Sequence, residues 1–201
     1  MYQRKDAFYA RAKAVGYRSR AAFKIEQLAQ RARLFRHGDR VIDVGAWPGG
    51  WLQVAAQHVG PTGRVVGIDL QRIEPLPERN VVTICGDITN AEVQAQVLAL
   101  CGGKADVVLS DLAPKLSGVK ARDEARQQEL AECVLHFAVQ VLKPDGKLVV
   151  KLFMSPDLQA YLGQLRMHFP DVRTVRPEAT RKSSAEIYAI AAGFGRGTNA
   201  P

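Results

Sequence analysis

The chain has 201 residues, 47% of them hydrophobic, and this size suits one globular domain with a full core. Its formal net charge is +8, from 28 lysines and arginines against 20 aspartates and glutamates. We find no apolar run near the ~20 residues of a membrane span and no apolar core of a secretion signal. Three scattered cysteines show neither a Cys-x-x-Cys pair nor a zinc-ligand spacing, so we expect a reducing, cytoplasmic setting and no structural metal.

The positive charge is concentrated near the N-terminus. Residues 1–40 hold 11 lysines or arginines against 3 acids, whereas the remaining residues hold 17 of each sign. Aromatic side chains are interleaved with these basic residues, at Tyr2, Phe8, Tyr9 and Tyr17. Because basic side chains bind phosphates and aromatic rings stack on bases, residues 1–40 are a candidate RNA-binding arm and helix. A basic arm that only aids solubility would have the same composition.

Hydrophobic patterning predicts alternating helices and strands. The first predicted helix has its apolar positions at i, i+4, i+7 and i+11, namely Ala21, Ile25, Leu28 and Ala32. Strands are expected at 40–44, 64–69, 81–85, 105–110 and 147–152. Helices are expected near 50–59, 90–101 and 122–142. This alternation predicts an α/β fold with a mostly parallel sheet.

The C-terminal part of the chain completes the predicted domain. Lys143-Pro-Asp-Gly146 predicts a turn that ends the long helix before the fifth strand. A helix over 156–168 is then followed by two closing strands, at about 171–176 and 185–192. We therefore expect a single domain over residues 1–192 and a loose tail over 193–201.

A glycine-rich loop follows the first predicted strand. In Val41–Trp51 an apolar run breaks into a loop whose glycines allow the backbone to approach a ligand closely. The next apolar run ends on Asp69, 24 residues after Gly45, and this spacing is typical of a nucleoside pocket in which the acid binds ribose hydroxyls. The loop reads G-x-x-x-G-G rather than the G-x-G-x-x-G of a dinucleotide site. The sequence therefore predicts an adenosine-containing cofactor smaller than a dinucleotide.

Charged residues stand near the carboxyl ends of five successive predicted strands, at Asp43, Asp69, Asp87, Asp111 and Lys151. In an open parallel sheet, ligands bind outside these strand ends. A single acid at such a position is usually a helix cap or a turn residue. Charged residues at strand after strand instead indicate a functional site.

Five motifs carry a resemblance to a known family. They are RSRAAFKI (18–25), GAWPGGW (45–51), SDLAPKLSG (110–118), VVKLF (149–153) and RKSSAEIY (181–188). Together they resemble the FtsJ/RrmJ family of ribose 2'-O-methyltransferases, in the family's order and over nearly the whole chain. The resemblance implies a Rossmann-like class I methyltransferase that uses S-adenosylmethionine. It also implies a mostly parallel, seven-stranded sheet with helices on both faces.

The same resemblance implies the site residues. The family's Lys-Asp-Lys-Glu catalytic tetrad has counterparts at Lys24, Asp111, Lys151 and Glu186. Cofactor contacts are expected at Gly45, Gly49, Trp51, Asp69, Asp87 and Asp111. RNA contacts are expected at Arg18, Arg20, Lys24, Arg181 and Lys182.

The implied reaction is methyl transfer to the ribose 2'-hydroxyl of a uridine in large-subunit ribosomal RNA, with the assembled large subunit as the partner. The partners expected from the sequence include no membrane and no second protein. Two alternatives stay open. The same fold and tetrad would serve a 2'-O-methyltransferase that acts on transfer RNA. A non-catalytic ribosome-assembly factor with a vestigial cofactor pocket would also bind RNA, although a broken tetrad would then be expected and none is broken.

Three residue roles stay open at the level of sequence. Lys151 either removes the hydroxyl proton or only orients the hydroxyl, since Lys24 as a like charge favours the first role and the two acids favour the second. Trp51 begins a predicted helix and serves equally well as a core anchor. Trp47 stands where the family usually has alanine, and a large ring there alters the surroundings of the cofactor loop.

Overall fold

The computed structural model describes residues 7–181 and 184–196. Two helices, α1 (Ala7–Ala14) and α2 (Ala22–Ala32), precede the sheet. The first half of the α/β domain comprises β1 (Arg40–Val44), α3 (Gly50–Val59), β2 (Arg64–Asp69), β3 (Val81–Cys85), α4 (Ala91–Cys101) and β4 (Ala105–Ser110). The second half comprises α5 (Lys120–Val141), β5 (Leu142–Phe153), α6 (Leu158–Arg166), β6 (Asp171–Val175) and β7 (Glu186–Ala192).

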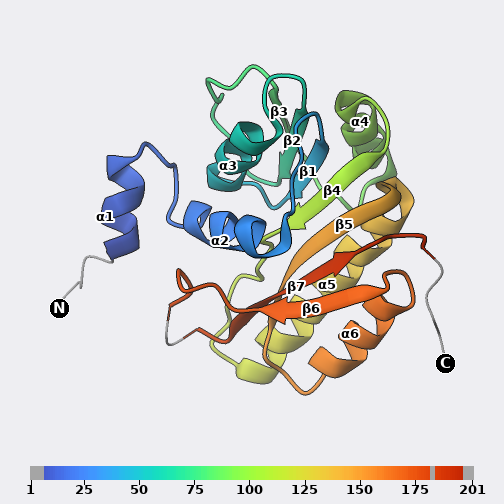
Figure 1. Cartoon of the computed structure of the whole chain (residues 1–201). Helices are drawn as coiled ribbons and strands as arrows, with labels where there is room; N and C mark the ends of the chain where they lie inside the picture. The colour runs from blue at the N-terminus through green and yellow to red at the C-terminus, as the bar shows by residue number, and fades with distance from the viewer. Residues whose placement is uncertain (1–6, 182–183, 197–201) are drawn as a thin grey trace.

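The seven strands form one sheet in the order β3-β2-β1-β4-β5-β7-β6 (Figure 1). The first five strands along the sheet pair in parallel, while β7 pairs antiparallel with both β5 and β6. The predicted mostly parallel, seven-stranded sheet is therefore confirmed. In the middle of the sheet the parallel strands all end at one edge, which is where sequence analysis placed the charged residues.

Alternating side chains of the central strands fill two apolar layers. Val41 and Val149 face α2 and α3 on one side of the sheet, whereas Ile42 and Val150 face α4, α5 and α6 on the other (Figure 1). Such strands are buried on both faces and therefore read as continuous apolar runs rather than as alternating ones. This explains why their limits could be read closely from the sequence. No helix within the described ranges is long and apolar enough to cross a membrane.

The predicted turn at residues 143–146 is wrong as a boundary, because β5 begins at Leu142. Leu142 is buried and pairs with Ala105 of β4 before the register shifts. The Lys143 ammonium bonds the carboxylate of Asp106 at 2.7 Å, so contact with β4 continues through this segment. A local bend remains inside the strand, where Asp145 adopts a left-handed conformation with φ of 67°.

The residues just after β7 are held to this bend rather than loose. Phe194 accepts a hydrogen bond from the Asp145 amide at 2.8 Å and donates one to the Gly146 carbonyl at 3.1 Å. Its ring packs on Phe169 with centroids 5.5 Å apart, and Arg196 forms an ion pair with Asp145. The predicted loose tail therefore does not begin at residue 193, and residues 197–201 lie outside the described part of the chain.

Candidate active site

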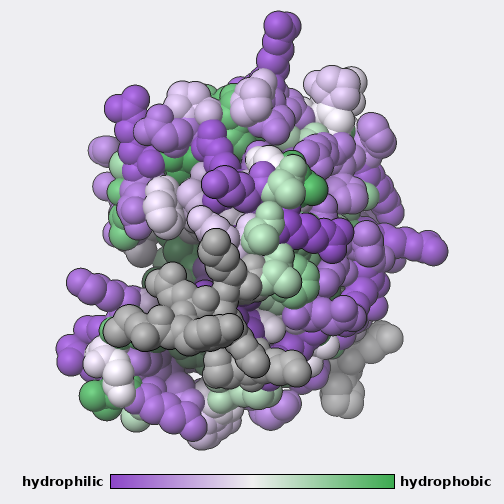
Figure 2. Space-filling view, turned by 90° about the vertical axis from the view of Figure 1, so that its left-hand side faces the viewer, coloured by the Kyte–Doolittle hydropathy of each residue, from purple (hydrophilic) through white to green (hydrophobic). Residues whose placement is uncertain are grey.

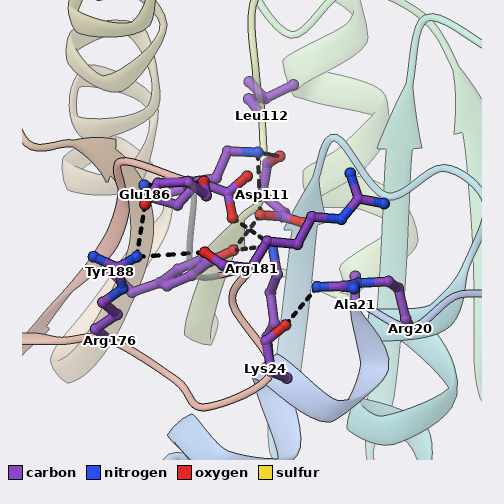
Figure 3. Close-up of polar contacts among 12 residues, drawn as sticks. Arg20, Ala21, Lys24, Asp111, Leu112, Arg176, Arg181, Glu186 and Tyr188 are labelled. Atoms are coloured by element: carbon purple, nitrogen blue, oxygen red, sulfur yellow. Dashed lines mark hydrogen bonds and ion pairs between the residues drawn. The ribbon is translucent and has the colours of Figure 1, made fainter. Parts of the chain in front are cut away.

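The four predicted tetrad residues meet at the carboxyl edge of the sheet, and Figure 3 labels three of them, Lys24, Asp111 and Glu186. The Lys24 Nζ atom lies 2.9 Å from Glu186 Oε2, and the Lys151 Nζ atom lies 3.2 Å from Asp111 Oδ1. Lys151 also donates to the backbone carbonyl of Asp111 at 2.5 Å. Two lysines thus face two carboxylates, and this pairing balances the charge of a site in which both ammonium groups are buried.

Strand register and helix packing bring these residues together. Lys151 of β5 is directly opposite Tyr188 of β7, and Phe153 is opposite Glu186. Side chains two residues apart on a strand point to the same face, so Lys151, Glu186 and Tyr188 share one side of the sheet. Helix α2 covers that side with a buried face that includes Lys24. Lys151 lies within an apolar strand and Lys24 on a buried helix face, and each forms an ion pair with a carboxylate there.

Tyr188 is a site residue that the sequence reasoning missed. Its hydroxyl donates to Asp111 Oδ1 at 2.7 Å and accepts from Lys24 Nζ at 3.0 Å, so it links the two ion pairs (Figure 3). Burial, followed by the nearby Asp111 carboxylate, raises the pKa of Tyr188 well above its ordinary value and keeps the hydroxyl protonated. The sequence did contain a clue to this residue. Tyr188 follows Glu186 by two residues on one predicted strand, and such side chains point to the same face of the sheet.

Gln127 of α5 fixes the two segments that carry Asp111 and Lys151. Its amide Nε2 donates to the carbonyl of Lys151 at 2.8 Å and to that of Leu112 at 3.3 Å. The side chain is only 3% exposed. Helix α5 therefore ties the end of β5 to the loop that follows β4, and it sets the spacing between the catalytic candidates.

A pocket of about 510 Å³ opens beside the tetrad at the same edge of the sheet. Its walls include Ile68, Ile88, Leu112 and Leu130, which are apolar, together with the carboxylates of Asp69 and Asp87 and the backbone of Gly45. A Cβ atom on Gly45 would lie 2.6 Å from the Leu112 side chain, so only glycine leaves this approach open. Lys115, Arg126 and Glu129 also belong to the lining. The apolar walls match the faces of an adenine ring, and Asp69 and Asp87 match the hydrogen-bond donors of a nucleoside, so these residues fit S-adenosylmethionine.

The two predicted pocket acids are held by the loops around them. Asp69 accepts hydrogen bonds from the backbone amides of Trp47 at 2.9 Å and Gln71 at 2.8 Å. Asp87 accepts from the amide of Thr89 at 2.9 Å and from its hydroxyl at 2.8 Å, and these bonds lower the pKa of Asp87. Both carboxylates are therefore oriented before any ligand binds, as a recognition site requires.

Asp43 lies beside this acidic edge but is completely buried. Neither carboxylate oxygen of Asp43 has a hydrogen-bond partner among the described residues. Burial, followed by repulsion from Asp111 and Asp69, raises the pKa of Asp43 well above its ordinary value. This residue is expected to carry its proton, which limits the negative charge beneath the glycine-rich loop.

Two predicted cofactor contacts in the glycine-rich loop lie outside the pocket walls. Gly49, with φ of 109°, packs against the Arg18 side chain, and its missing Cβ makes room for that contact. The Trp51 ring is 3% exposed, donates to the Ala21 carbonyl at 2.9 Å and lies 5.8 Å from the Tyr188 ring. Trp51 therefore acts as a core anchor, the second of its two predicted roles, and its ring packs beside Tyr188.

Among the predicted RNA-contact residues, Arg20 and Arg181 lie beside the tetrad (Figure 3). Arg18 donates to the carbonyls of Pro48, Glu74 and Pro75 at 3.2, 2.5 and 2.5 Å. Arg20 donates to the carbonyl of Ala179 at 2.6 Å, and its pKa is lowered by burial and then by Arg181. Arg181 is exposed, and Lys182 lies outside the described residues.

The strand order, the antiparallel β7 and a pocket with Asp69 and Asp87 in its walls are the features of S-adenosylmethionine-dependent methyltransferases. Comparisons with solved structures support this class. A ribosomal RNA methyltransferase from Plasmodium falciparum superposes with a TM-score of 0.78 at 28% identity, over 89% of this chain and 98% of that one. Fibrillarin from Aeropyrum pernix, solved with bound S-adenosylmethionine, shares the fold with a TM-score of 0.59 at 18% identity, over 85% of this chain and 76% of that one.

Sequence comparisons place the chain more narrowly. The model of the family described as FtsJ-like methyltransferase matches residues 17–194. Ribosomal RNA large subunit methyltransferase E of Methanobrevibacter smithii is 44% identical, over 96% of this chain and 92% of its own length. The protein of the same name from Myxococcus xanthus is 42% identical, over 94% and 89%. The chain belongs to the FtsJ-like methyltransferase family, and it is an S-adenosylmethionine-dependent methyltransferase.

Proposed function

We propose that this enzyme methylates the ribose 2'-hydroxyl of a uridine in large-subunit ribosomal RNA. The observation that carries the proposal is the tetrad, in which two buried lysines and two carboxylates meet beside the pocket that contains Asp69 and Asp87. The names of the two relatives, large subunit methyltransferases of ribosomal RNA, favour this RNA as the substrate. A cytoplasmic location, and the assembled large subunit as partner, follow from that substrate.

The chemistry requires the ribose oxygen to meet an electrophilic methyl group in line, at about 3 to 3.5 Å. S-adenosylmethionine supplies this methyl group from its sulfonium when it is bound. Gly45, Asp69 and Asp87 line the pocket and would hold the nucleoside. Asp111 is proposed to meet the amino acid end, because the next residue, Leu112, is part of the pocket wall. Most of the catalytic task is therefore the placement of the 2'-hydroxyl.

Lys151 is the proposed contact for that hydroxyl. A lysine ammonium has three N–H donors, and two of them are directed at the carboxylate and carbonyl oxygens of Asp111. The third remains for the ribose oxygen. Because β5 and Gln127 fix the backbone at Lys151, the donor has a defined direction. With the cofactor bound, the carbon–oxygen bond would form as the carbon–sulfur bond breaks. The hydroxyl proton would pass to solvent where Lys151 is an ammonium that only orients the oxygen, and to the Lys151 amine where that amine is neutral.

Lys24 and Glu186 are proposed to position the RNA rather than to exchange the proton. Lys24 lies on the far side of Tyr188 from Asp111, and Glu186 fixes its ammonium at 2.9 Å. The positive charge of Lys24 is then available to a phosphate or ribose oxygen of the bound strand. Arg20 and Arg181 extend this positive surface from the neighbouring segments.

The RNA surface is proposed to continue over α1 and α2. Figure 2 views the molecule from the side of these helices, and hydrophilic residues cover most of that face. Helix α1 has a single buried residue, Ala12, which clusters with Phe23 and Ala179. Phe8 and Arg11 of the same helix also pack on the Phe23 ring, so one face of α1 is anchored and the opposite face is exposed to a large substrate. Lys13 and Tyr9 are exposed there.

Transfer of labelled methyl groups tests the proposal. Large ribosomal subunits, free ribosomal RNA and transfer RNA, all from methylation-deficient cells, are incubated with the enzyme and labelled S-adenosylmethionine, and the RNA is then hydrolysed in alkali. A ribose methyl group protects the adjoining phosphodiester, so label in an alkali-resistant dinucleotide from the large subunit is expected. Label in transfer RNA alone would overturn the substrate and keep the chemistry. Cofactor binding without any label would favour an assembly factor.

A further inference from the structure

Trp47 is the exposed member of the chain's two tryptophans. Its exposed fraction is 51%, whereas that of Trp51 is 3%. A tryptophan is large and apolar, and its ring nitrogen usually has a hydrogen-bond partner when the side chain packs against protein. Within the described part of the chain, the Trp47 indole has neither a hydrogen bond nor a stacked ring. Core packing therefore does not explain this side chain.

The backbone of Trp47 is fixed to the cofactor site, although its ring does not line the pocket. Its amide donates to Asp69 Oδ2 at 2.9 Å, while the pocket walls include Asp69 and Gly45 but not Trp47. Gly45, two residues earlier, packs against Leu112, which directly follows Asp111. Trp47 thus belongs to the loop that borders the cofactor pocket, and its ring is exposed there.

Two arginines belong to the segments around this loop. The Arg18 guanidinium donates to the carbonyl of Pro48, the residue after Trp47, at 3.2 Å. Arg72 is exposed three residues beyond Asp69. An exposed aromatic ring on a loop with arginines in its neighbouring segments suits single-stranded nucleic acid, because the ring stacks on a base and the cations attract the phosphates. An apolar protein partner would gain nothing from the two arginines.

We propose that Trp47 is a stacking platform for an unpaired nucleobase of the RNA substrate, next to the nucleotide that is methylated. This inference rests on the proposed function, since it takes the substrate to be RNA. Stacking on an aromatic ring depends little on which base is present, so Trp47 contributes to RNA affinity and to the placement of the target rather than to base choice. The cofactor pocket does not need the ring.

Intrinsic fluorescence tests the platform directly. Because Trp51 is buried, a change in tryptophan emission on addition of free ribosomal RNA, which has no protein fluorescence, reports mainly on Trp47. We expect quenching by this RNA in the wild type and its loss in Trp47→Phe. S-adenosylmethionine alone is expected to leave the emission nearly unchanged. Quenching by the cofactor and not by RNA would assign Trp47 to the cofactor pocket and overturn the inference.

Steady-state kinetics gives the second readout. Trp47→Ala is expected to raise the RNA KM about tenfold and to leave the KM for S-adenosylmethionine unchanged, and Trp47→Phe is expected to restore most of the loss. Met167→Ala, which also removes an exposed apolar side chain, is the matched control and should change neither constant. If the wild type methylates RNA and Trp47→Ala has an unchanged RNA KM, the stacking role of Trp47 is wrong, while the proposed function of the enzyme stands. If the wild type methylates no RNA, the proposed function itself fails.

Discussion

Lys151 is held by both the carboxylate and the backbone carbonyl of Asp111, so its ammonium has little freedom to move. Lys151→Ala is expected to lower methyl transfer by about 10²- to 10⁴-fold and to leave S-adenosylmethionine binding nearly unchanged by calorimetry. Lys151→Arg separates two roles, because a guanidinium orients a hydroxyl but does not accept its proton. Turnover within tenfold of the wild type in Lys151→Arg would assign orientation to Lys151, whereas turnover equal to the alanine variant would assign proton removal.

Tyr188 connects the two ion pairs through one hydroxyl. Tyr188→Phe removes the bonds to Asp111 and Lys24 and keeps the ring that packs on Trp51. We expect kcat to fall about tenfold with cofactor affinity retained, and Tm to fall by about 2–4 °C for the loss of roughly 1 kcal/mol. Single-turnover rates and thermal melts measure the two effects. An unchanged kcat beside a lowered Tm would leave Tyr188 with a structural role only.

The buried Asp43 carboxyl makes stability depend on pH. Its pKa is raised in the folded protein, so the native state binds more protons than the unfolded chain above the ordinary carboxyl pKa of about 4. The stability that the protonated group contributes is present below that value and is lost as pH rises through the raised pKa. In Asp43→Asn this loss should disappear, and the variant should gain Tm relative to the wild type between about pH 4 and pH 8. Parallel melting curves for both proteins across that range would contradict the shift.

Arg18 acts at the scale of elements, because one guanidinium joins the segment before α2 to the loops after β1 and β2. Arg18→Gln should therefore raise the Kd for S-adenosylmethionine several-fold as well as weaken RNA binding. Lys13→Gln, on the exposed side of α1, removes the same charge without those contacts. It should reduce the salt slope of RNA binding by about 1 and leave cofactor affinity unchanged. Calorimetry and RNA titrations at several salt concentrations compare the pair, and equal cofactor affinities would argue against the proposed loop contact.

The elements differ in how well the sequence predicted them. The limits of β1 to β4 match the predicted strands because runs rich in β-branched residues end abruptly at polar loops, and in β1, β2 and β4 these runs are also buried. Helix α1 was anticipated only as part of a basic arm, since its apolar residues show no stripe. The start of β5 was misplaced because pairing with β4 overrides the turn preference of Pro144 and Gly146.

The site residues that belong to family motifs could be predicted from the sequence. The site residues whose roles depend on long-range contacts could not. The tetrad positions came from the family resemblance, and the structure brings all four together. Gln127 gave no signal, because a glutamine within a helix is usually solvated and its role depends on two carbonyls from distant segments. The roles of Arg18 and Gly49 were likewise invisible, since their mutual packing joins residues far apart in the chain.

At the scale of the whole molecule, the segment after β7 packs on the end of the sheet opposite the active site. A variant that ends at Ala192 loses the Phe194 packing, its two backbone bonds and the Arg196 ion pair. We expect its Tm to fall by about 4–8 °C, for a loss of roughly 2 kcal/mol. A variant that ends at Arg196 keeps these contacts and should melt as the full chain does. Equal melting of the two truncated chains would show that residues 193–196 do not stabilise the domain.

The tetrad also ties activity to the completion of folding. Lys24 and Glu186 are separated by 162 positions, and Lys151 and Asp111 by 40, so the site exists only after both ends of the domain have met. Contacts of such long range form late, because chain closure must precede them. During refolding from denaturant, recovery of helix signal should therefore run ahead of recovery of methyl transfer. Each molecule then becomes active only when its last strand has joined the sheet, and partly folded chains do not methylate RNA.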